Sequence, residues 1–330
     1  MKPLLEINEL STSFFSDNDE IKAVDQVSLT INEGEIVGIV GESGSGKSVT
    51  SLSIMSLLQD TPGKVVGGSI RFMDRDLLHL SAKEKRNIRG NEMAMIFQEP
   101  MTSLNPVLKI GKQLEEPIKK HLNYNKKQAR THAISMLEKV GIPRASEIVD
   151  DYPHQLSGGM RQRVMIAMAM SCSPRLLIAD EPTTALDVTI QAQILELMKK
   201  VQQEESTSIL LITHDLGVVA EMCDRVAVMY AGRIVEQGTV YDIFENPKHP
   251  YTKGLLASIP RLGSEVDRLS SIEGNVPAPN EWPKGCKFAT RCPYAFEKCW
   301  QQEPPMFAFD NDQRSRCWLN DGEKGDVASE

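Results

Sequence analysis

Short apolar runs alternate along the chain with stretches whose apolar residues recur every three or four positions. The runs have strand length and carry few polar residues, which is typical of parallel strands covered on both faces. They lie at residues 36–40, 93–97, 176–181 and 209–213. Residues 49–58, 161–171 and 249–258 have a helical pattern instead. The alternation of the two patterns predicts an α/β fold.

A long insertion separates the second apolar run from the third, and its composition differs from that of the predicted sheet. Residues 110–121 and 126–140 have helical spacing, so that Ala133, Met136 and Leu137 share one face and charged residues lie elsewhere. This pattern predicts a helical subdomain over about residues 99–173.

A glycine-rich segment follows the run at 36–40 directly and fits the pattern G-x-x-x-x-G-K-[ST] at every fixed position. Its glycines let successive backbone N–H groups turn toward phosphates, Lys47 adds a positive charge near the β and γ groups, and the Ser48 hydroxyl can bind Mg²⁺. The segment therefore predicts a phosphate loop that binds a nucleoside triphosphate, made of Gly41, Glu42, Ser43, Gly44, Ser45, Gly46, Lys47 and Ser48.

Two carboxylates end the apolar run at 176–181. In open α/β sheets ligands bind at the carboxyl ends of the strands, so Asp180 is a candidate for holding Mg²⁺ and Glu181 for polarising the attacking water. An acidic helix cap would also explain the pair, but the phosphate loop upstream favours the catalytic interpretation.

A second anion site is predicted where Ser157, Gly158 and Gly159 open the helical stretch at 161–171. A hydroxyl, bare N–H groups and the positive end of a helix dipole meet there. One γ-phosphate does not need two such sites from one domain. We therefore expect two subunits to share each nucleotide, with the phosphate loop of one facing the serine-glycine turn of the other.

Composition narrows the class of protein. With 330 residues, 41% of them hydrophobic, the chain can form one large domain with an appendage, or two domains. A net charge of −8 argues against a general nucleic-acid surface. No apolar run is long enough to span a bilayer, and charge interrupts the N-terminus too early for a secretory signal. We expect a cytosolic chain that reaches a membrane only by docking onto another protein.

The order of these motifs resembles that of ATP-binding cassette (ABC) transporter ATPases over about residues 4–245, with Ala185-Leu186-Asp187 after Glu181 and a lone His214 after the run at 209–213. The resemblance implies a P-loop core with an antiparallel β subdomain and a helical subdomain. It also implies that Gln98 touches Mg²⁺ and the lytic water. The same resemblance implies that His214 contacts the γ-phosphate and that Phe14, with Phe15 beside it, stacks on adenine.

The site implied in this way has three sets of residues. Catalytic roles fall to Glu181, His214 and Gln98, and Mg²⁺ is held by Ser48, Gln98 and Asp180. ATP binding adds to the phosphate loop the residues Phe14, Ser157, Gly158, Gly159, Gln162 and Asp187.

Two longer segments, 98–106 and 246–256, look like those of the oligopeptide and dipeptide importer branch. That likeness implies an ATPase subunit, peripheral on the cytoplasmic face of the membrane, that pairs with a second homologous ATPase subunit. Two permease subunits and an extracytoplasmic peptide-binding protein complete such an importer. A nickel importer is the alternative, and a soluble ABC ATPase a more distant one. We expect an ATP-binding domain at 1–245 and an extension at 246–330.

Four of the six cysteines gather in this extension, at Cys286, Cys292, Cys299 and Cys317. Their spacing is wider than that of zinc knuckles, and thiolates suit a [4Fe–4S] cluster and zinc equally, so that cluster, Zn²⁺ and plain reduced thiols all stay open. Resemblance of residues 285–293 to the importer tail favours [4Fe–4S]. Because the cysteines are distant from the phosphate motifs along the sequence, we expect them to have little direct effect on ATP affinity.

Overall fold

The computed structural model describes residues 2–16, 19–59, 61–98, 103–184, 187–259 and 272–322. The chain divides into two compact units, which are treated separately. Unit 1 holds residues 1–5, 31–36 and 72–212, and unit 2 holds residues 6–30, 37–71 and 213–330. Elements that cross a boundary between the units, such as β1 and β2, have most of their residues in one of them.

Unit 1 contains a parallel sheet in which β7 (Leu176–Asp180) pairs with β6 (Met93–Ile96) on one side and with β8 (Ser208–Thr213) on the other. Every residue of β7 and β8 is buried. The predicted strands are confirmed to within a residue or so at their ends. A short β5 (Arg75–Asp76) and α2 (Ala82–Ile88) precede this sheet in the chain.

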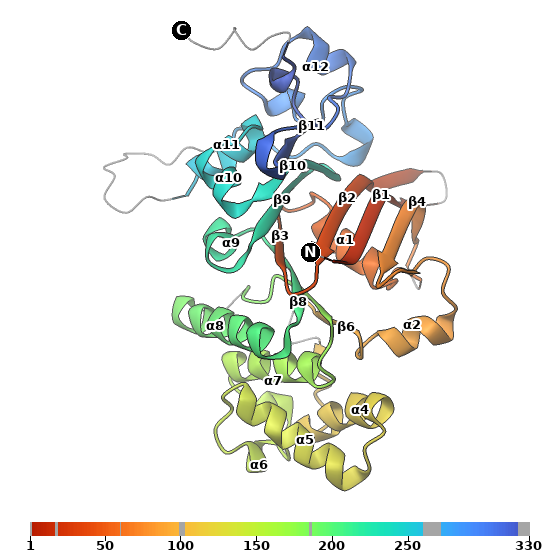
Figure 1. Ribbon diagram of the computed structural model, residues 1–330, viewed down its shortest axis with the longest axis vertical. Helices are drawn as coiled ribbons and strands as arrows, with labels where there is room; N and C mark the ends of the chain where they lie inside the picture. The colour runs from red at the N-terminus through yellow and green to blue at the C-terminus, as the bar shows by residue number, and fades with distance from the viewer. Residues whose placement is uncertain are drawn as a thin grey trace. The chain divides into compact units, whose positions relative to one another are not determined.

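The predicted helical insertion is confirmed within unit 1. It contains α4 (Ile110–Leu122), α5 (Lys126–Lys139), α6 (Ala145–Ile148) and α7 (Gly158–Met170), which gather together in Figure 1, and α8 (Val188–Glu205) follows β7. Helix α5 begins at a capping box, because the side chains of Asn125 and Gln128 each accept the other's backbone N–H at 3.0 Å. Its predicted face is buried through Ala133, Met136 and Leu137.

Unit 2 contains strands of two sheets. Neighbours in one are β2 (Glu20–Asn32), β1 (Pro3–Phe15) and β4 (Gly63–Phe72), in that order. In the other, β3 (Ile36–Val40) runs parallel to β9 (Arg225–Tyr230), and β9 runs antiparallel to β10 (Arg233–Thr239). Helix α1 (Lys47–Ile54) follows β3, and α9 (Leu216–Met222) precedes β9.

The C-terminal extension adds to the second of these sheets. Its helices are α10 (Val240–Glu245), α11 (Pro250–Ala257) and α12 (Glu297–Gln301). Strand β12 (Arg314–Ser315) pairs antiparallel with β10 and with β11 (Phe307–Ala308). Short 3-10 helices lie at Pro153–Gln155 in unit 1 and at Pro279–Glu281, Ala289–Arg291, Asp310–Asp312 and Trp318–Asn320 in unit 2.

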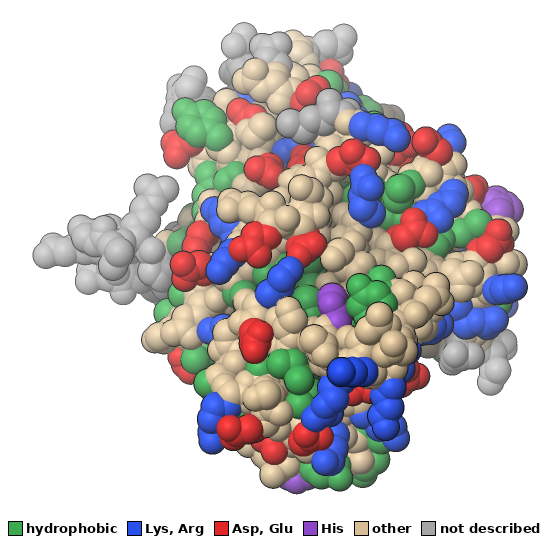
Figure 2. All heavy atoms as spheres, turned by 60° about the horizontal axis from the view of Figure 1, so that its bottom comes forward, with side chains coloured by type: hydrophobic (Ala, Val, Ile, Leu, Met, Phe, Trp, Pro, Cys, Tyr) green, Lys and Arg blue, Asp and Glu red, His purple; other side chains and the backbone are tan. Residues whose placement is uncertain are grey.

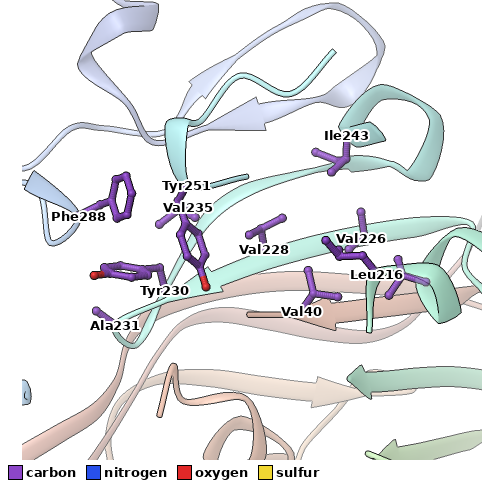
Figure 3. Close-up of a cluster of buried hydrophobic side chains, with 11 residues drawn as sticks. Val40, Leu216, Val226, Val228, Tyr230, Ala231, Val235, Ile243, Tyr251 and Phe288 are labelled. Carbon is purple, nitrogen blue, oxygen red and sulfur yellow. The ribbon is translucent and has the colours of Figure 1, made fainter. Parts of the chain in front are cut away.

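One hydrophobic core joins the extension to the strand that leads into the glycine-rich loop. Val40 of β3, Tyr230 of β9, Tyr251 of α11 and Phe288 are buried in a single cluster (Figure 3). Ala289, Cys299 and Trp318 form only a small cluster of their own. The extension is therefore stabilised mainly by packing on the sheet. The boundary between domains at residue 245 stays a prediction.

The surface and the helices bear on the kind of partner. Figure 2 shows basic and acidic side chains intermixed over the face in view. In the part of the chain that the structure describes, no helix is long and apolar enough to cross a membrane.

Candidate functional site

The glycine-rich loop turns sharply between β3 and α1. Gly41, Gly44 and Gly46 have φ angles of 155°, 78° and 100°, in the region that favours glycine. A Cβ atom at Gly41 would lie 2.1 Å from the Met229 carbonyl oxygen, and one at Gly46 would lie 2.6 Å from that of Ala23. The fit of backbone against backbone excludes a side chain at both positions. The first N–H groups of α1 open from this turn, which suits an anion.

The Lys47 side chain lies inside the loop and donates hydrogen bonds to the loop backbone. This side chain is buried, and Nζ donates to the carbonyl oxygens of Gly41 at 2.7 Å and Glu42 at 3.0 Å. The turn between β9 and β10 braces the loop from outside, because the Gly232 N–H donates to the Ser45 carbonyl at 2.9 Å. A positive charge thus lies inside a rigid ring of backbone, as binding of a triphosphate requires.

Glu181 lies directly after β7 in unit 1, with a left-handed φ of 47° that is uncommon outside glycine. Its N–H donates to the Ile212 carbonyl at 2.8 Å, which fixes the backbone against the next strand. Its Oε2 accepts hydrogen bonds from Gln98 Nε2 and Thr184 Oγ1, both at 3.0 Å. The structure thus brings together Gln98 and Glu181, which the sequence linked only through a family resemblance. Thr184 was missed, because a threonine three residues after a glutamate is no distinctive signal.

Ser157 of the serine-glycine turn caps α7, which begins at Gly158 and thus three residues before the predicted start, and the anion site there stays a prediction. Ser157 Oγ accepts the N–H of Met160 at 3.3 Å, and Gly159 lies so close to Ile190 that a Cβ would meet its Cγ2 atom at 2.9 Å. Gln162 is buried and donates to the Pro182 carbonyl, while Asp187 caps α8 by accepting the N–H of Ile190 at 2.9 Å. The turn is therefore tied to the segment that follows Glu181. Contacts of Gln162 and Asp187 with a nucleotide stay predictions, and Ala185 and Leu186 lie outside the described residues.

The other candidates are spread over both units. Asp180 is the buried last residue of β7 in unit 1, and His214 is exposed after β8 and belongs to unit 2. Phe14 of β1 packs against Gly63, where a Cβ would lie 2.9 Å from its ring. Phe15 is 39% exposed, with Lys64 Nζ 5.6 Å from its ring centroid. Their roles toward a nucleotide stay predictions.

The four C-terminal cysteines, like Cys172 and Cys223, are free thiols. The Cys286 N–H donates to the Cys299 carbonyl at 2.8 Å. Burial and then the nearby thiols, among them Cys292, raise the pKa of Cys286 and of Cys317 to about 12. Within the described ranges, no group of three or more His, Cys, Asp or Glu side chains is arranged so that it could hold a metal ion.

The segment that carries the cysteines is distant from the phosphate motifs along the sequence but contacts the glycine-rich loop, while the expected small effect of the cysteines on ATP affinity stays a prediction. Arg291, which precedes Cys292, donates from Nη1 and Nη2 to the two carboxylate oxygens of Glu42 at 2.7 and 3.0 Å. Tyr251 Oη accepts the Glu42 N–H at 2.9 Å. Residues separated by more than 200 positions in the sequence thus meet at the glycine-rich loop, and no local pattern announces such contacts.

Comparison with known proteins shows to which class of protein this fold and phosphate loop belong. A family model described as ABC transporter matches residues 24–184, and one described as oligopeptide/dipeptide transporter, C-terminal region, matches residues 235–299. A solved dimeric ATP-binding cassette, in a post-hydrolysis state bound to ADP and Pi, is similar with a TM-score of 0.63 and 28% identity, over 72% of this chain and 98% of its own. The fold and the phosphate loop thus define an ABC-type ATPase.

Relatives that match nearly the whole chain narrow the class of ABC-type ATPase. The oligopeptide transport ATP-binding protein AppD of Bacillus subtilis is 57% identical over 98% of both chains. The dipeptide transport ATP-binding protein DppD of Escherichia coli is 51% identical over 95% of this chain and 96% of its own. The chain belongs to the family of ATP-binding subunits of oligopeptide and dipeptide ABC transporters.

Proposed function

We propose that this chain hydrolyses ATP to drive the import of peptides. The observation that carries the proposal is the closed glycine loop around Lys47, in a chain that matches peptide-transport ATP-binding proteins over 95% and 98% of its length. The relatives do not favour the nickel alternative, since those compared carry peptide-transport names.

Within the proposed reaction, the loop N–H groups and Lys47 bind the phosphates of ATP. Ser48, Asp180 and Gln98 carry the hydroxyl, carboxylate and amide oxygens that Mg²⁺ prefers, and the ion would neutralise phosphate charge. Glu181 accepts a proton from the attacking water. Hydrogen bonds from Gln98 and Thr184 to the same oxygen hold its carboxylate in one orientation.

Two copies of the cassette fold must meet for the proposed cycle, because the phosphate loop and the serine-glycine turn are separate anion sites. The dimeric state of the similar solved cassette supports this view. We infer a heterodimer with a second ATPase subunit, docked beneath two permease subunits on the cytoplasmic face of the membrane, which receive peptide from a binding protein. Ser157→Arg should block stimulation by the companion subunit while ATP still binds. Full activity of a dilute monomer would contradict the shared site.

A [4Fe–4S] cluster held by Cys286, Cys292, Cys299 and Cys317 is a finer proposal. Its support is the gathering of four soft thiols on a segment with little core of its own, which a cluster would cross-link. We expect protein purified without oxygen to be brown, with iron and acid-labile sulfide in near-equal amounts. One zinc ion per chain without sulfide, or no metal at all, would overturn the cluster.

Growth tests the function as a whole. A strain that lacks this chain should fail to grow when defined peptides are its only source of a required amino acid, and the wild-type gene should restore growth. A Lys47→Ala gene should not restore it. Normal peptide uptake without the chain would contradict the proposal, and loss of nickel uptake alone would revive the alternative.

A further inference from the structure

The C-terminal extension holds the second residue of the phosphate loop at two points. The Arg291 guanidinium meets the Glu42 carboxylate with two parallel hydrogen bonds, the arrangement that gives such pairs their strength and direction. The backbone of Glu42 is held as well, because its N–H donates to Tyr251 Oη. Side chain and main chain of one loop residue are thus both fixed from the extension.

Arg291 is itself rigidly placed. Its side chain is 3% exposed, against 33% for that of Glu42. Nε donates to the Glu273 carbonyl at 2.9 Å, and Nη2 also donates to that of Ile272 at 3.2 Å. The hydrogen bonds to Glu42 raise the pKa of Arg291 above its ordinary value, so its charge is permanent. The extension therefore presents a fixed cation to the loop.

Tyr251 is held by packing. Its ring centroid lies 4.7 Å from that of Tyr230 and 5.4 Å from that of Phe288. The three rings lie beside one another in Figure 3. Phe288 follows Lys287, whose Nζ donates to Asp25 at 2.9 Å. The Asp25 N–H donates to the carbonyl of Gly232, the residue whose N–H braces the phosphate loop. The contacts of the extension thus converge on one small region.

A carboxylate in a loop that binds a polyanion opposes its ligand, because like charges repel across such short distances. Arg291 cancels that charge. We propose that Arg291 and Tyr251 are positioning residues of the nucleotide site and that the extension sets ATP affinity through Glu42. This inference rests on the proposed function, since it assumes that the loop binds ATP.

Equilibrium binding of a fluorescent ATP analogue with Mg²⁺ to the full chain tests the inference. Arg291→Ala should weaken binding about tenfold, as loss of a charge-assisted pair with one partner 33% exposed does. Arg291→Lys should lie between it and the wild type. The decisive variant is Glu42→Gln combined with Arg291→Ala, which removes both charges and should restore binding to within about threefold of the wild type.

Lys298→Ala is the matched control. It removes an ion pair with Asp321 and a contact 3.7 Å above the Trp318 ring, within the extension but away from the loop, and should leave affinity unchanged. Tyr251→Phe keeps the packing, removes one acceptor and should weaken binding about threefold, so it serves if Arg291→Ala does not fold.

Several results would overturn the inference. One is native ATP affinity in Arg291→Ala, or in Tyr251→Phe if Arg291→Ala does not fold. Another is a double variant whose ATP affinity is not restored. A third is a loss of ATP affinity in Lys298→Ala as large as that in Arg291→Ala. A wild-type chain that does not bind ATP would instead refute the proposed function, so the two failures are distinguishable.

Discussion

The phosphate loop and Glu181 each follow a buried strand, and different kinds of contact hold them in place. In unit 2, charge holds the surroundings of the phosphate loop, through Glu42 with Arg291 and through Asp25 with Lys287 and Arg233. In unit 1, an amide and a hydroxyl hold Glu181. Ion pairs cancel charge where a polyanion must bind. Neutral donors orient a carboxylate and leave its negative charge in place, as a group that accepts a proton requires.

The largest expected effect comes from removing the proton acceptor. Glu181→Gln should lower ATP turnover by about 10²–10⁴-fold with nucleotide affinity unchanged, because the amide keeps the shape of the side chain and loses its basicity. Phosphate release by the assembled transporter measures turnover, and equilibrium binding measures nucleotide affinity. Glu33→Gln makes the same chemical change at a surface ion pair with Arg175 and should alter neither. Near-native turnover of Glu181→Gln would contradict the assignment of Glu181 as the proton acceptor.

A smaller effect is expected on binding at the loop. Lys47→Ala should weaken ATP binding by about 10–100-fold, because a buried charge that meets the phosphates is lost. Isothermal titration of the full chain measures it. Lys200→Ala removes an exposed lysine of α8 and serves as the control. Unchanged affinity in Lys47→Ala would count against the phosphate loop itself.

The stability that the ion pairs of Asp25 contribute should depend on pH. Burial alone would raise the pKa of Asp25, but Lys287 and Arg233 outweigh it and hold that pKa at about 2, against 3.8. The carboxylate therefore contributes stability above pH 4 that is lost as the pH falls toward 2, about 2 kcal/mol in total. Burial lowers the pKa of Lys287 to about 8, despite the attraction of Asp25.

Denaturant unfolding of Asp25→Asn tests this bracing. The variant should lose about 2 kcal/mol at pH 7, and the difference from the wild type should shrink as the pH approaches 2. Asp19→Asn, at an exposed position of the same unit, should follow the wild-type curve. A difference between Asp25→Asn and the wild type that does not change with pH would rule out the ion pairs as its source.

The smallest effect tests the neutral bracing. Thr184→Val should lower turnover about fivefold, since a donor to Glu181 Oε2 is lost at a cost of about 1 kcal/mol. Thr184→Ser keeps the hydroxyl and should retain most of the activity. Steady-state kinetics should show the loss in kcat and not in KM. A change confined to KM would place Thr184 in binding instead of orientation.

The elements that sequence predicts well are those whose signal is local. Strand β3, helices α4 and α5 and the glycine loop were predicted within a residue or two, because apolar period and turn chemistry act over a few positions. Arg291 and Lys287 carry no such pattern, and their partners lie 249 and 262 positions away. The pairing of β12 with β10 was missed for the same reason. Thr184 is close to Glu181 in the sequence, but a threonine three residues after a glutamate is no distinctive signal. The pairing of Gln98 with Glu181 needed a family resemblance.

The pairing of Asp25 with Lys287 has a consequence for the newborn chain. A ribosome that adds about 5–20 residues per second needs roughly 13–50 s to make the 262 residues between them. During that interval Asp25 has no Lys287 to meet, and Val40, joined late in the interval by Tyr230, still lacks the ring of Phe288 that belongs to the same cluster. The region around the phosphate loop therefore reaches its final form only after Lys287 and Phe288 have been made. A ribosome stalled before Phe288 would display a chain with an incomplete core, which is the kind of surface that chaperones bind.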